Sequence, residues 1–295
     1  MALRQTLKAY GPGWRRDPRD YQLVALSGLF TMAWLSSDFG TRPAVLAAAL
    51  AGTLLVQAAG TWLTSGRPRA STLEWKSALI TAFGLSILLR ATDLWIWTAA
   101  GAIAIGAKFA IRVRGKHVFN PACIGIVAML LISGHQAWVS PGQWGQASLL
   151  GGYVVALGAL TLSSAKRLDI ALGFLLAYAL IVVGRGLWLG DPPVIALHHL
   201  STGSLLIFAF FMITDPRSTP DRRLGRVLLA ISVAALAAWL QFGPNVQAAP
   251  LVALALLAPL TPVLDRLLPA RRFRWRPVPA APASGHSSSL KEASS

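Results

Sequence analysis

The chain has 295 residues, of which 55% are hydrophobic and 13% are charged, and its mean hydropathy is +0.57. A soluble domain carries about a quarter charged residues, so the composition excludes an ordinary soluble protein. Its 11 Trp, 11 Phe and long aliphatic runs also exclude a disordered chain. A single cysteine, Cys123, excludes a disulfide framework within the chain. We expect an all-α integral membrane protein.

Ten apolar segments follow one another along the chain, and the length leaves room for about ten crossings of roughly 20 residues each. The predicted transmembrane helices lie at 21–37, 43–63, 73–89, 94–111, 119–133, 147–163, 170–189, 201–213, 227–242 and 246–264. They define a basic segment (1–20), a first five-helix half (21–133), an outer loop (134–146), a second half (147–265) and a tail (266–295). The tail is basic and then rich in Pro, Ala and Ser, which predicts disorder.

The formal net charge is +16, and the basic residues that produce it are distributed along the chain as the predicted topology requires. With the N-terminus inside, 24 of the 27 basic residues fall in cytoplasmic segments, and only Arg42, Arg90 and Arg185 fall at or near the outer side. This distribution follows the positive-inside rule and predicts a multi-pass protein of a bacterial-type inner membrane, in contact with lipid, with both termini cytoplasmic. Because the charge is spread over six short segments, a nucleic-acid partner is not expected.

The ten predicted crossings divide into two groups of five. Residues 77–83 of the third crossing and 204–210 of the eighth agree at five of seven positions. These two crossings run in opposite directions, so a duplication would give an inverted repeat, a design that often places a binding site near interrupted helices. The alternative is coincidence among residues that are common in membrane helices.

A first polar motif, residues 115–122 (GKHVFNPA), precedes an unusually short crossing. Asn120 is suited to cap a helix that starts with Pro121. The positive end of that helix, with Lys116 adding charge, could hold an anion or an electron-rich ring. The alternative is that the basic residues only anchor the helix to lipid phosphates.

A second motif, FFMITDPRSTP at residues 210–220, ends the other short crossing. A carboxylate at this depth, Asp215, is costly unless it is paired, so it is a candidate functional residue beside Thr214. The alternative is a structural turn in which Arg217 is its ion-pair partner. No catalytic residue and no metal site is predicted; adjacent His198 and His199 point about 100° apart on a helix.

Together, these two motifs and the order of the ten spans resemble the NqrB/RnfD-type family of membrane subunits. That family contains the RnfD component of Rnf electron-transport complexes and the NqrB component of the sodium-pumping NADH:quinone reductase. The stretch 137–145 (AWVSPGQWG) resembles the UnbU-like branch more closely. The resemblance implies a subunit that holds flavin and passes electrons within a multi-subunit, ion-translocating complex. It makes Lys116, His117, Asn120, Thr214, Asp215 and Arg217 the candidate cofactor-binding residues.

The chain departs from that family in its outer loop. The loop at 134–146 lacks the SGAT-like threonine on which Rnf-type subunits carry covalent FMN. Covalent FMN is therefore not expected, whereas a noncovalent flavin (FMN or riboflavin) or a quinone is consistent with the resemblance. The chain would be at most a redox-carrying subunit of an oxidoreductase, working with other membrane or redox subunits. The alternatives are a transporter for an ion or small solute, or a non-redox membrane assembly protein of a biosynthetic cluster.

Overall fold

Helices form at the predicted apolar segments wherever the computed structural model describes the chain. It describes residues 18–35, 41–65, 74–140, 152–153, 155–156, 158 and 167–273. The basic segment before residue 18, most of the predicted sixth crossing, and the tail after residue 273 lie outside these residues. Within the described part the protein is an all-α membrane protein with two short strand pairs.

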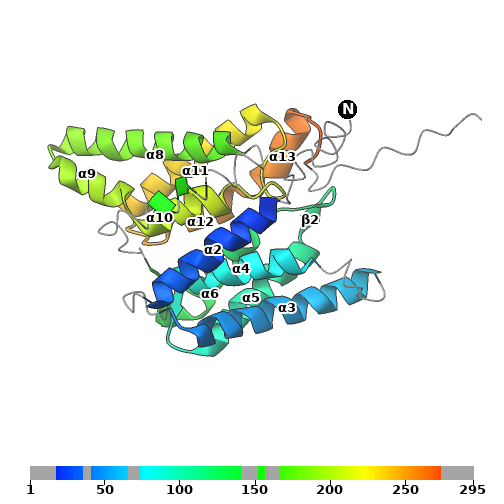
Figure 1. The fold of residues 1–295 in the computed structure, drawn as a ribbon. Helices are drawn as coiled ribbons and strands as arrows, with labels where there is room; N and C mark the ends of the chain where they lie inside the picture. The colour runs from blue at the N-terminus through cyan, green and yellow to red at the C-terminus, as the bar shows by residue number, and fades with distance from the viewer. Residues whose placement is uncertain are drawn as a thin grey trace, which may run out of the picture.

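Each half of the chain contributes one group of helices (Figure 1). The first half forms α2 (Pro18–Leu35), α3 (Pro43–Ser65), α4 (Trp75–Leu88), α5 (Leu94–Ala110) and α6 (Pro121–Ile132). The second half forms α8 (Leu168–Leu189), α9 (Pro193–Leu200), α10 (Gly203–Ile207), the π-helical segment η3 (Phe208–Met212), α11 (Arg223–Phe242), α12 (Ala249–Leu257) and α13 (Leu260–Leu267). In Figure 1 the first group lies below the second.

Three described helices, α3, α8 and α11, are long and apolar enough to cross a membrane. Two bent pairs raise that number to five if each pair is one span: α9 with α10 and η3, bent by 48°, and α12 with α13, bent by 50°. Three more apolar helices, α4, α5 and α6, are shorter than 18 residues. The total of ten crossings stays a prediction.

The second half contains more helix breaks than we expected. The tenth segment, predicted as one helix at 246–264, is two helices that meet beside Pro259. Proline lacks the N–H and crowds the preceding turn, so the helix bends there. The eighth segment is short, as predicted, but α9 precedes it at a sharp angle, and this helix was missed.

Small residues bring the helices of the first half close together. A Cβ added to Gly52 of α3 would lie 2.0 Å from the Thr98 carbonyl oxygen of α5, and one added to Gly125 of α6 would lie 2.5 Å from the Ala100 carbonyl oxygen. Packing of this kind is common between membrane helices, where apolar burial alone gives little driving force.

The same packing order recurs in the second half, as a five-plus-five repeat would require. In the first half α3 packs on α5 and α5 on α6; in the second, α8 packs on α11 and α11 on α12, and α6 contacts α12 between the halves. The inverted relation between the halves stays a prediction.

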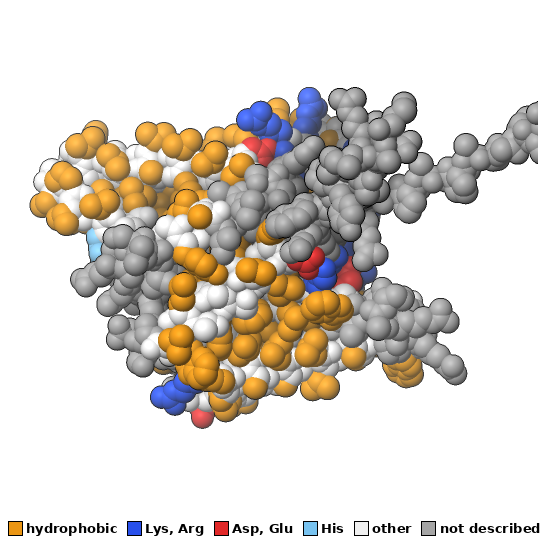
Figure 2. Space-filling model, in the orientation of Figure 1, with side chains coloured by type: hydrophobic (Ala, Val, Ile, Leu, Met, Phe, Trp, Pro, Cys, Tyr) orange, Lys and Arg blue, Asp and Glu red, His pale blue; other side chains and the backbone are white. Residues whose placement is uncertain are grey.

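Two antiparallel strand pairs lie at opposite ends of the helices. Strands β1 (Leu89–Ala91) and β4 (Ala137–Val139) pair at one end, while β2 (Arg112–Val113) and β3 (Lys116–His117) form a hairpin at the other. We call the hairpin's end the charged end, because Glu74, Lys108, Asp215 and Arg226 also gather there. Figure 2 shows apolar side chains along the length of the visible face and charged side chains toward its ends.

Candidate functional site

The GKHVFNPA motif forms a tight turn followed by a capped helix. Arg114 and Gly115 have φ values of 50° and 79°, which suits a two-residue hairpin turn between β2 and β3. Glycine adopts such φ values at little cost, and Arg114 does so because the strands on either side fix the turn. Next, Asn120 accepts a hydrogen bond from the Cys123 N–H at 3.0 Å, and Pro121 is the first residue of α6. The predicted cap is confirmed.

The TDP motif is a turn held by its own hydroxyl groups. Thr214 donates to the Phe210 carbonyl oxygen at 2.8 Å, and Thr219 donates to the Asp215 carbonyl oxygen at 2.8 Å. The Asp215 carboxylate accepts from the Arg217 N–H at 3.0 Å and from the Ser218 hydroxyl at 3.1 Å. The turn that contains Asp215 comes directly after the π-helical segment η3, and π-helical turns often lie at functional sites. The backbone is thus shaped to fix one carboxylate.

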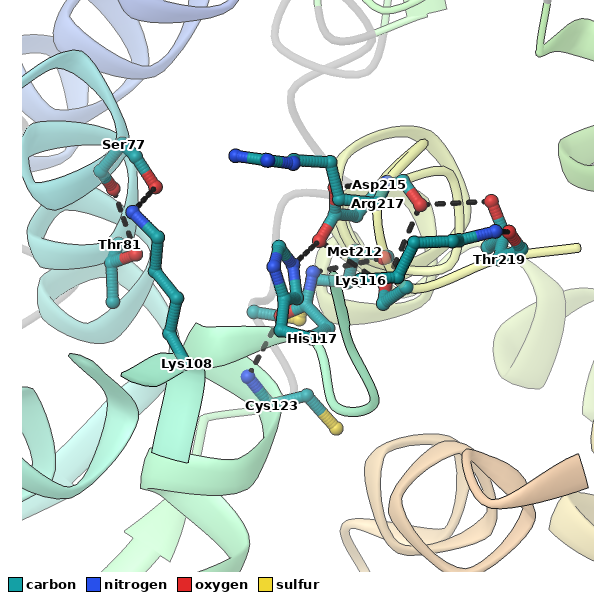
Figure 3. Close-up of polar contacts among 12 residues, drawn as sticks. Ser77, Thr81, Lys108, Lys116, His117, Cys123, Met212, Asp215, Arg217 and Thr219 are labelled. Atoms are coloured by element: carbon teal, nitrogen blue, oxygen red, sulfur yellow. Dashed lines mark hydrogen bonds and ion pairs between the residues drawn. The ribbon is translucent and has the colours of Figure 1, made fainter. Parts of the chain in front are cut away.

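The structure brings the two motifs together (Figure 3). The His117 Nε2 atom lies 2.9 Å from Asp215 Oδ2. The amide nitrogen of Asn120 donates to the Met212 carbonyl oxygen at 3.0 Å. We call His117, Asn120, Thr214 and Asp215 the inner site. Its side chains come from both halves of the chain.

Arg217, in contrast, is not the ion-pair partner of Asp215 in the structure. Its guanidinium lies 3.0 Å from Glu74 Oε1, and only its backbone N–H contacts the Asp215 carboxylate. In Figure 3 the Arg217 side chain extends away from the His117–Asp215 contact. The alternative that Asp215 is merely half of an Asp215–Arg217 pair is therefore wrong, because the side chain that contacts the Asp215 carboxylate across the two motifs is His117.

Lys116 lies next to the inner site, but its charge is balanced by other carboxylates. Its ammonium lies 2.8 Å from Asp265 Oδ2 and 3.3 Å from Asp221 Oδ2, and it donates to the Thr219 carbonyl oxygen at 2.7 Å. These contacts tie the hairpin to α13 and to the loop after the TDP motif. A role for Lys116 in holding an anion stays a prediction.

A buried ion pair beside the inner site was missed at the sequence level. Lys108 is 2% exposed and lies 2.7 Å from Glu74 Oε2. Its ammonium also lies 3.1 Å from the Gln57 amide oxygen and 3.2 Å from the Ser77 hydroxyl. A signal was present, since Lys108 falls inside a predicted apolar span, where an ionisable residue is a functional candidate by default.

Two cavities differ in size and in the end of the molecule that they occupy. The inner cavity, of about 80 Å³, is lined by His117, Asn120, Asp215, Arg217 and Glu74. The outer cavity, of about 690 Å³, is lined by polar side chains such as Tyr178, His199 and Gln241 and by apolar ones such as Phe208 and Trp138. Ligand pockets of roughly 300–1,000 Å³ hold drug-sized molecules, so of these two cavities the outer one has the size of a flavin or quinone site.

Hydrogen bonds fix the positions of polar side chains that line the outer cavity. Gln241 accepts a bond from the Tyr178 hydroxyl and lies 2.9 Å, nitrogen to nitrogen, from His199 Nδ1. Ser201 and Thr202 do not cap α10: their hydroxyls donate backward to the His198 and His199 carbonyl oxygens. They therefore hold the end of α9 instead.

Known proteins resemble this chain over most of its length. A family model described as the NQR2, RnfD, RnfE family matches residues 134–274. A protein of Stutzerimonas stutzeri, named as the D component of an ion-translocating oxidoreductase complex, is 32% identical over 203 residues, covering 64% of this chain and 55% of that protein. Proteins of the same name from Alcanivorax borkumensis (29% over 283 residues, 72% of this chain and 79% of the relative) and Pseudomonas paraeruginosa (26% over 299 residues, 80% and 86%) also match. The resemblance read from the two motifs is thereby confirmed: nearly half of the chain matches the model of the NQR2, RnfD, RnfE family, and the relatives that match over longer stretches are named as D components of ion-translocating oxidoreductase complexes.

Proposed function

We propose that this protein is a membrane subunit of an ion-translocating electron-transport complex, in which the inner site handles the transported proton or ion. The contact between His117 and Asp215 carries the proposal, because it places an ionisable pair at the junction of the two halves. Ionisable side chains within membrane spans are rare and mark proton or ion pathways, and Asp215 of this pair closely follows the apolar segment that ends at Met212. The names of the relatives, each a component of an ion-translocating oxidoreductase complex, support the same function.

The size of the inner cavity limits what it can hold. About 80 Å³ admits water or a small ion but not a flavin ring, which needs a pocket in the range of several hundred Å³. We therefore assign Asp215, with His117 as its partner, to proton or ion handling, and Thr214 to the turn that holds Asp215. Asn120 and Arg217 fix the backbone around them, and Lys116 holds the hairpin against the second half.

The outer cavity supports noncovalent binding of a flavin (FMN or riboflavin) or a quinone. Its aromatic wall at Phe208 and Trp138 suits a flat ring, and the amide of Gln241 and the imidazole of His199 suit carbonyl groups on the edge of that ring. The redox cofactor would then sit at the end opposite the inner site. Electron transfer at one end and ion movement at the other would proceed in one subunit, with partner subunits supplying and removing electrons.

Orientation follows from the charge distribution. The β2–β3 hairpin and the start of α11 lie at the charged end. Both carry arginines, and the positive-inside rule predicts that such residues lie in the cytoplasm. We propose that this end faces the cytoplasm of a bacterial-type inner membrane and that both termini lie there. The inner site is then open to the cytoplasm and the outer cavity to the other side.

A transporter for a small solute is the second candidate, and one observation favours it. The segment from α10 through η3 lines both cavities: Phe208 faces the outer one, while Phe211 and Met212 face the inner one. A broken span between two cavities at opposite ends suits alternating access.

The absorbance spectrum of the purified full-length protein separates these functions. A flavin or quinone that is released on denaturation and identified by chromatography supports the electron-transport subunit. The variant Gln247→Trp, which places a ring at the exposed rim of the outer cavity, should lower cofactor content, whereas Ile80→Trp, which fills the inner cavity, should leave it unchanged. A colourless protein that carries solute into liposomes without partner subunits would overturn the proposal.

A further inference from the structure

His117 connects the inner cavity with another cavity at the charged end. That cavity, which we call the vestibule, has a volume of about 150 Å³. It is bounded by the β2–β3 hairpin, by α13 and by Pro269, Ala270 and Arg272. His117 is the one residue in the described part of the chain that lines both cavities. His117 is therefore the described residue that the two cavities share.

The segment after α13, Pro269–Phe273, forms the outer wall of the vestibule. Its far end is fastened by two contacts. The Phe273 N–H donates to Asp221 Oδ1 at 3.3 Å, and the Arg167 guanidinium lies 5.3 Å from the centre of the Phe273 ring. Arg167 is itself buried and donates to the Pro220 carbonyl oxygen at 3.0 Å. The wall is thus attached to fixed residues rather than lying loosely over the opening.

The vestibule is polar enough to hold water. Asp265 and Asp221 face it while paired with Lys116, and Thr261, Arg114 and Arg272 complete the polar lining. A water molecule needs at least about 10–15 Å³ of such space and two to four polar partners, so the cavity has room for several. An apolar cavity of this size would stay dry, but this one offers charged partners on several sides.

The Nδ1 atom of His117 requires a hydrogen-bond partner, and water in the vestibule is a candidate. The side chain is 6% exposed, and its Nε2 atom faces Asp215. Among the residues that the structure describes, no hydrogen bond to Nδ1 is formed. A buried polar atom is normally paired with protein or water. Because the hairpin presents His117 to the vestibule, water there is the available partner.

We propose that the vestibule admits water and is the route by which protons from the charged end reach His117. A hydronium ion gives its proton to Nδ1 and becomes water, and the proton on Nε2 passes to Asp215 Oδ2. The imidazole is then neutral again, with its proton on Nδ1, and the carboxyl group is protonated; the reverse steps return the proton. This transfer rests on the proposed function of Asp215, whereas the access route does not.

Charged and titratable groups lie around His117 on the sides of both cavities. On the vestibule side these are Arg114, Lys116, Asp221, Asp265 and Arg272; on the inner side they are Arg19, Glu74, Asp215 and Arg217. Both vestibule carboxylates contact the Lys116 ammonium, at 3.3 Å for Asp221 and 2.8 Å for Asp265. Among the described residues, Asp215 has the one carboxylate oxygen within hydrogen-bond distance of the imidazole, at 2.9 Å from Nε2, so it is the acceptor for the proton on His117.

Labelling of histidine by diethyl pyrocarbonate, followed residue by residue with mass spectrometry on the full-length protein in detergent, tests the route. His135, exposed at the other end, is the internal standard for reagent activity. Ala270→Trp fills the vestibule from an exposed position, so folding should be preserved, and Ile80→Trp fills the inner cavity as the matched control. We expect Ala270→Trp to slow labelling of His117 several-fold, and Ile80→Trp to leave it unchanged.

A second pair of variants tests the wall. Phe273→Ala removes the ring under Arg167 and should speed labelling of His117, while Phe242→Ala removes the similar Arg185 contact at the opposite end and should not. The proposal is overturned if Ile80→Trp slows labelling and Ala270→Trp does not, or if neither does. Because labelling requires neither cofactor nor transport, these outcomes do not depend on whether the proposed function is right.

Discussion

The imidazole of His117 and the carboxylate of Asp215 meet at 2.9 Å although 98 residues separate them in the chain. Local structure positions each side chain. His117 lies between a two-residue turn and a capped helix, and Asp215 lies in a hydroxyl-rich turn after a π-helical segment. The contact joins the two halves of the protein at the charged end. Both motifs therefore belong to one site.

The stability of the protein should depend on Asp215 in acid. Burial alone would raise the pKa of this carboxyl group, but His117 and the hydrogen bonds from the Arg217 N–H and Ser218 lower it from 3.8 to about 2. Since the pKa in the folded state is the lower one, the stabilisation is complete above about pH 4 and is lost as the pH falls toward about 2.

Melting temperatures of the wild type and of Asp215→Asn, measured from neutral pH downward, check this. We expect the wild type to be more stable at neutral pH and the difference to shrink below about pH 4. A difference that stays constant over that range would show that the carboxylate charge is not what stabilises the fold.

Asn120 has two roles that can be separated by substitution. Asn120→Ala removes the helix cap, worth about 0.5–2 kcal/mol, and also removes the side-chain donor to the Met212 carbonyl oxygen, which keeps the Asp215 N–H at 3.3 Å, at a further cost of about 0.5–1.5 kcal/mol. Asn120→Ser retains a capping oxygen but is too short to reach Met212. Chemical unfolding in detergent should place Asn120→Ser between the wild type and Asn120→Ala. Equal stability of the two variants would mean that the cap contributes nothing.

The buried ion pair of Glu74 and Lys108 should show strong coupling. Removing one partner of a buried pair costs about 3–5 kcal/mol, and because Glu74 is 37% exposed we expect Glu74→Gln to fall near the lower end. Lys108→Met removes the charge that would be left unpaired. A double-mutant cycle should therefore find the double variant more stable than Glu74→Gln alone. Simple additivity of the two single changes would exclude the coupling.

Much of the fold followed from hydropathy and charge. The ends of α3, α5 and α8 lie within a few residues of the predicted limits, because long apolar runs between polar loops leave little alternative in a membrane. The Asn120 cap was also predictable, since Asn before Pro is a local signal.

The contacts of the site were not predictable in the same way. Arg217 is two residues from Asp215 and was the obvious partner, yet His117 takes that place because the packing of the halves brings the hairpin to the TDP turn. The break between α12 and α13 was missed although Pro259 and Pro262 mark it, because the apolar run continues through them. Long-range pairing depends on tertiary packing, which a single sequence does not report.

No flavin should be attached covalently to this chain. A phosphoester link needs a Thr or Ser hydroxyl in a specific small-residue setting, and the loop at 134–146 offers only Ser140, followed by Pro141. Thr202, which lines the outer cavity, donates its hydroxyl to the His199 carbonyl oxygen. Intact-mass spectrometry of protein from a host with a flavin transferase should give the mass of the unmodified chain. An increase matching one FMN, or a band that stays fluorescent after denaturation, would contradict this.

Coupling between ion movement and electron transfer tests the role of the inner site most directly. The measurement is the number of protons or ions moved per electron in membrane vesicles that contain the assembled complex, for the wild type, Asp215→Asn and, as a control at the opposite end, Asp191→Asn. We predict that Asp215→Asn assembles and still passes electrons but moves few or no protons or ions, and that Asp191→Asn behaves like the wild type. An unchanged ratio in Asp215→Asn would contradict the assignment of ion handling to the inner site.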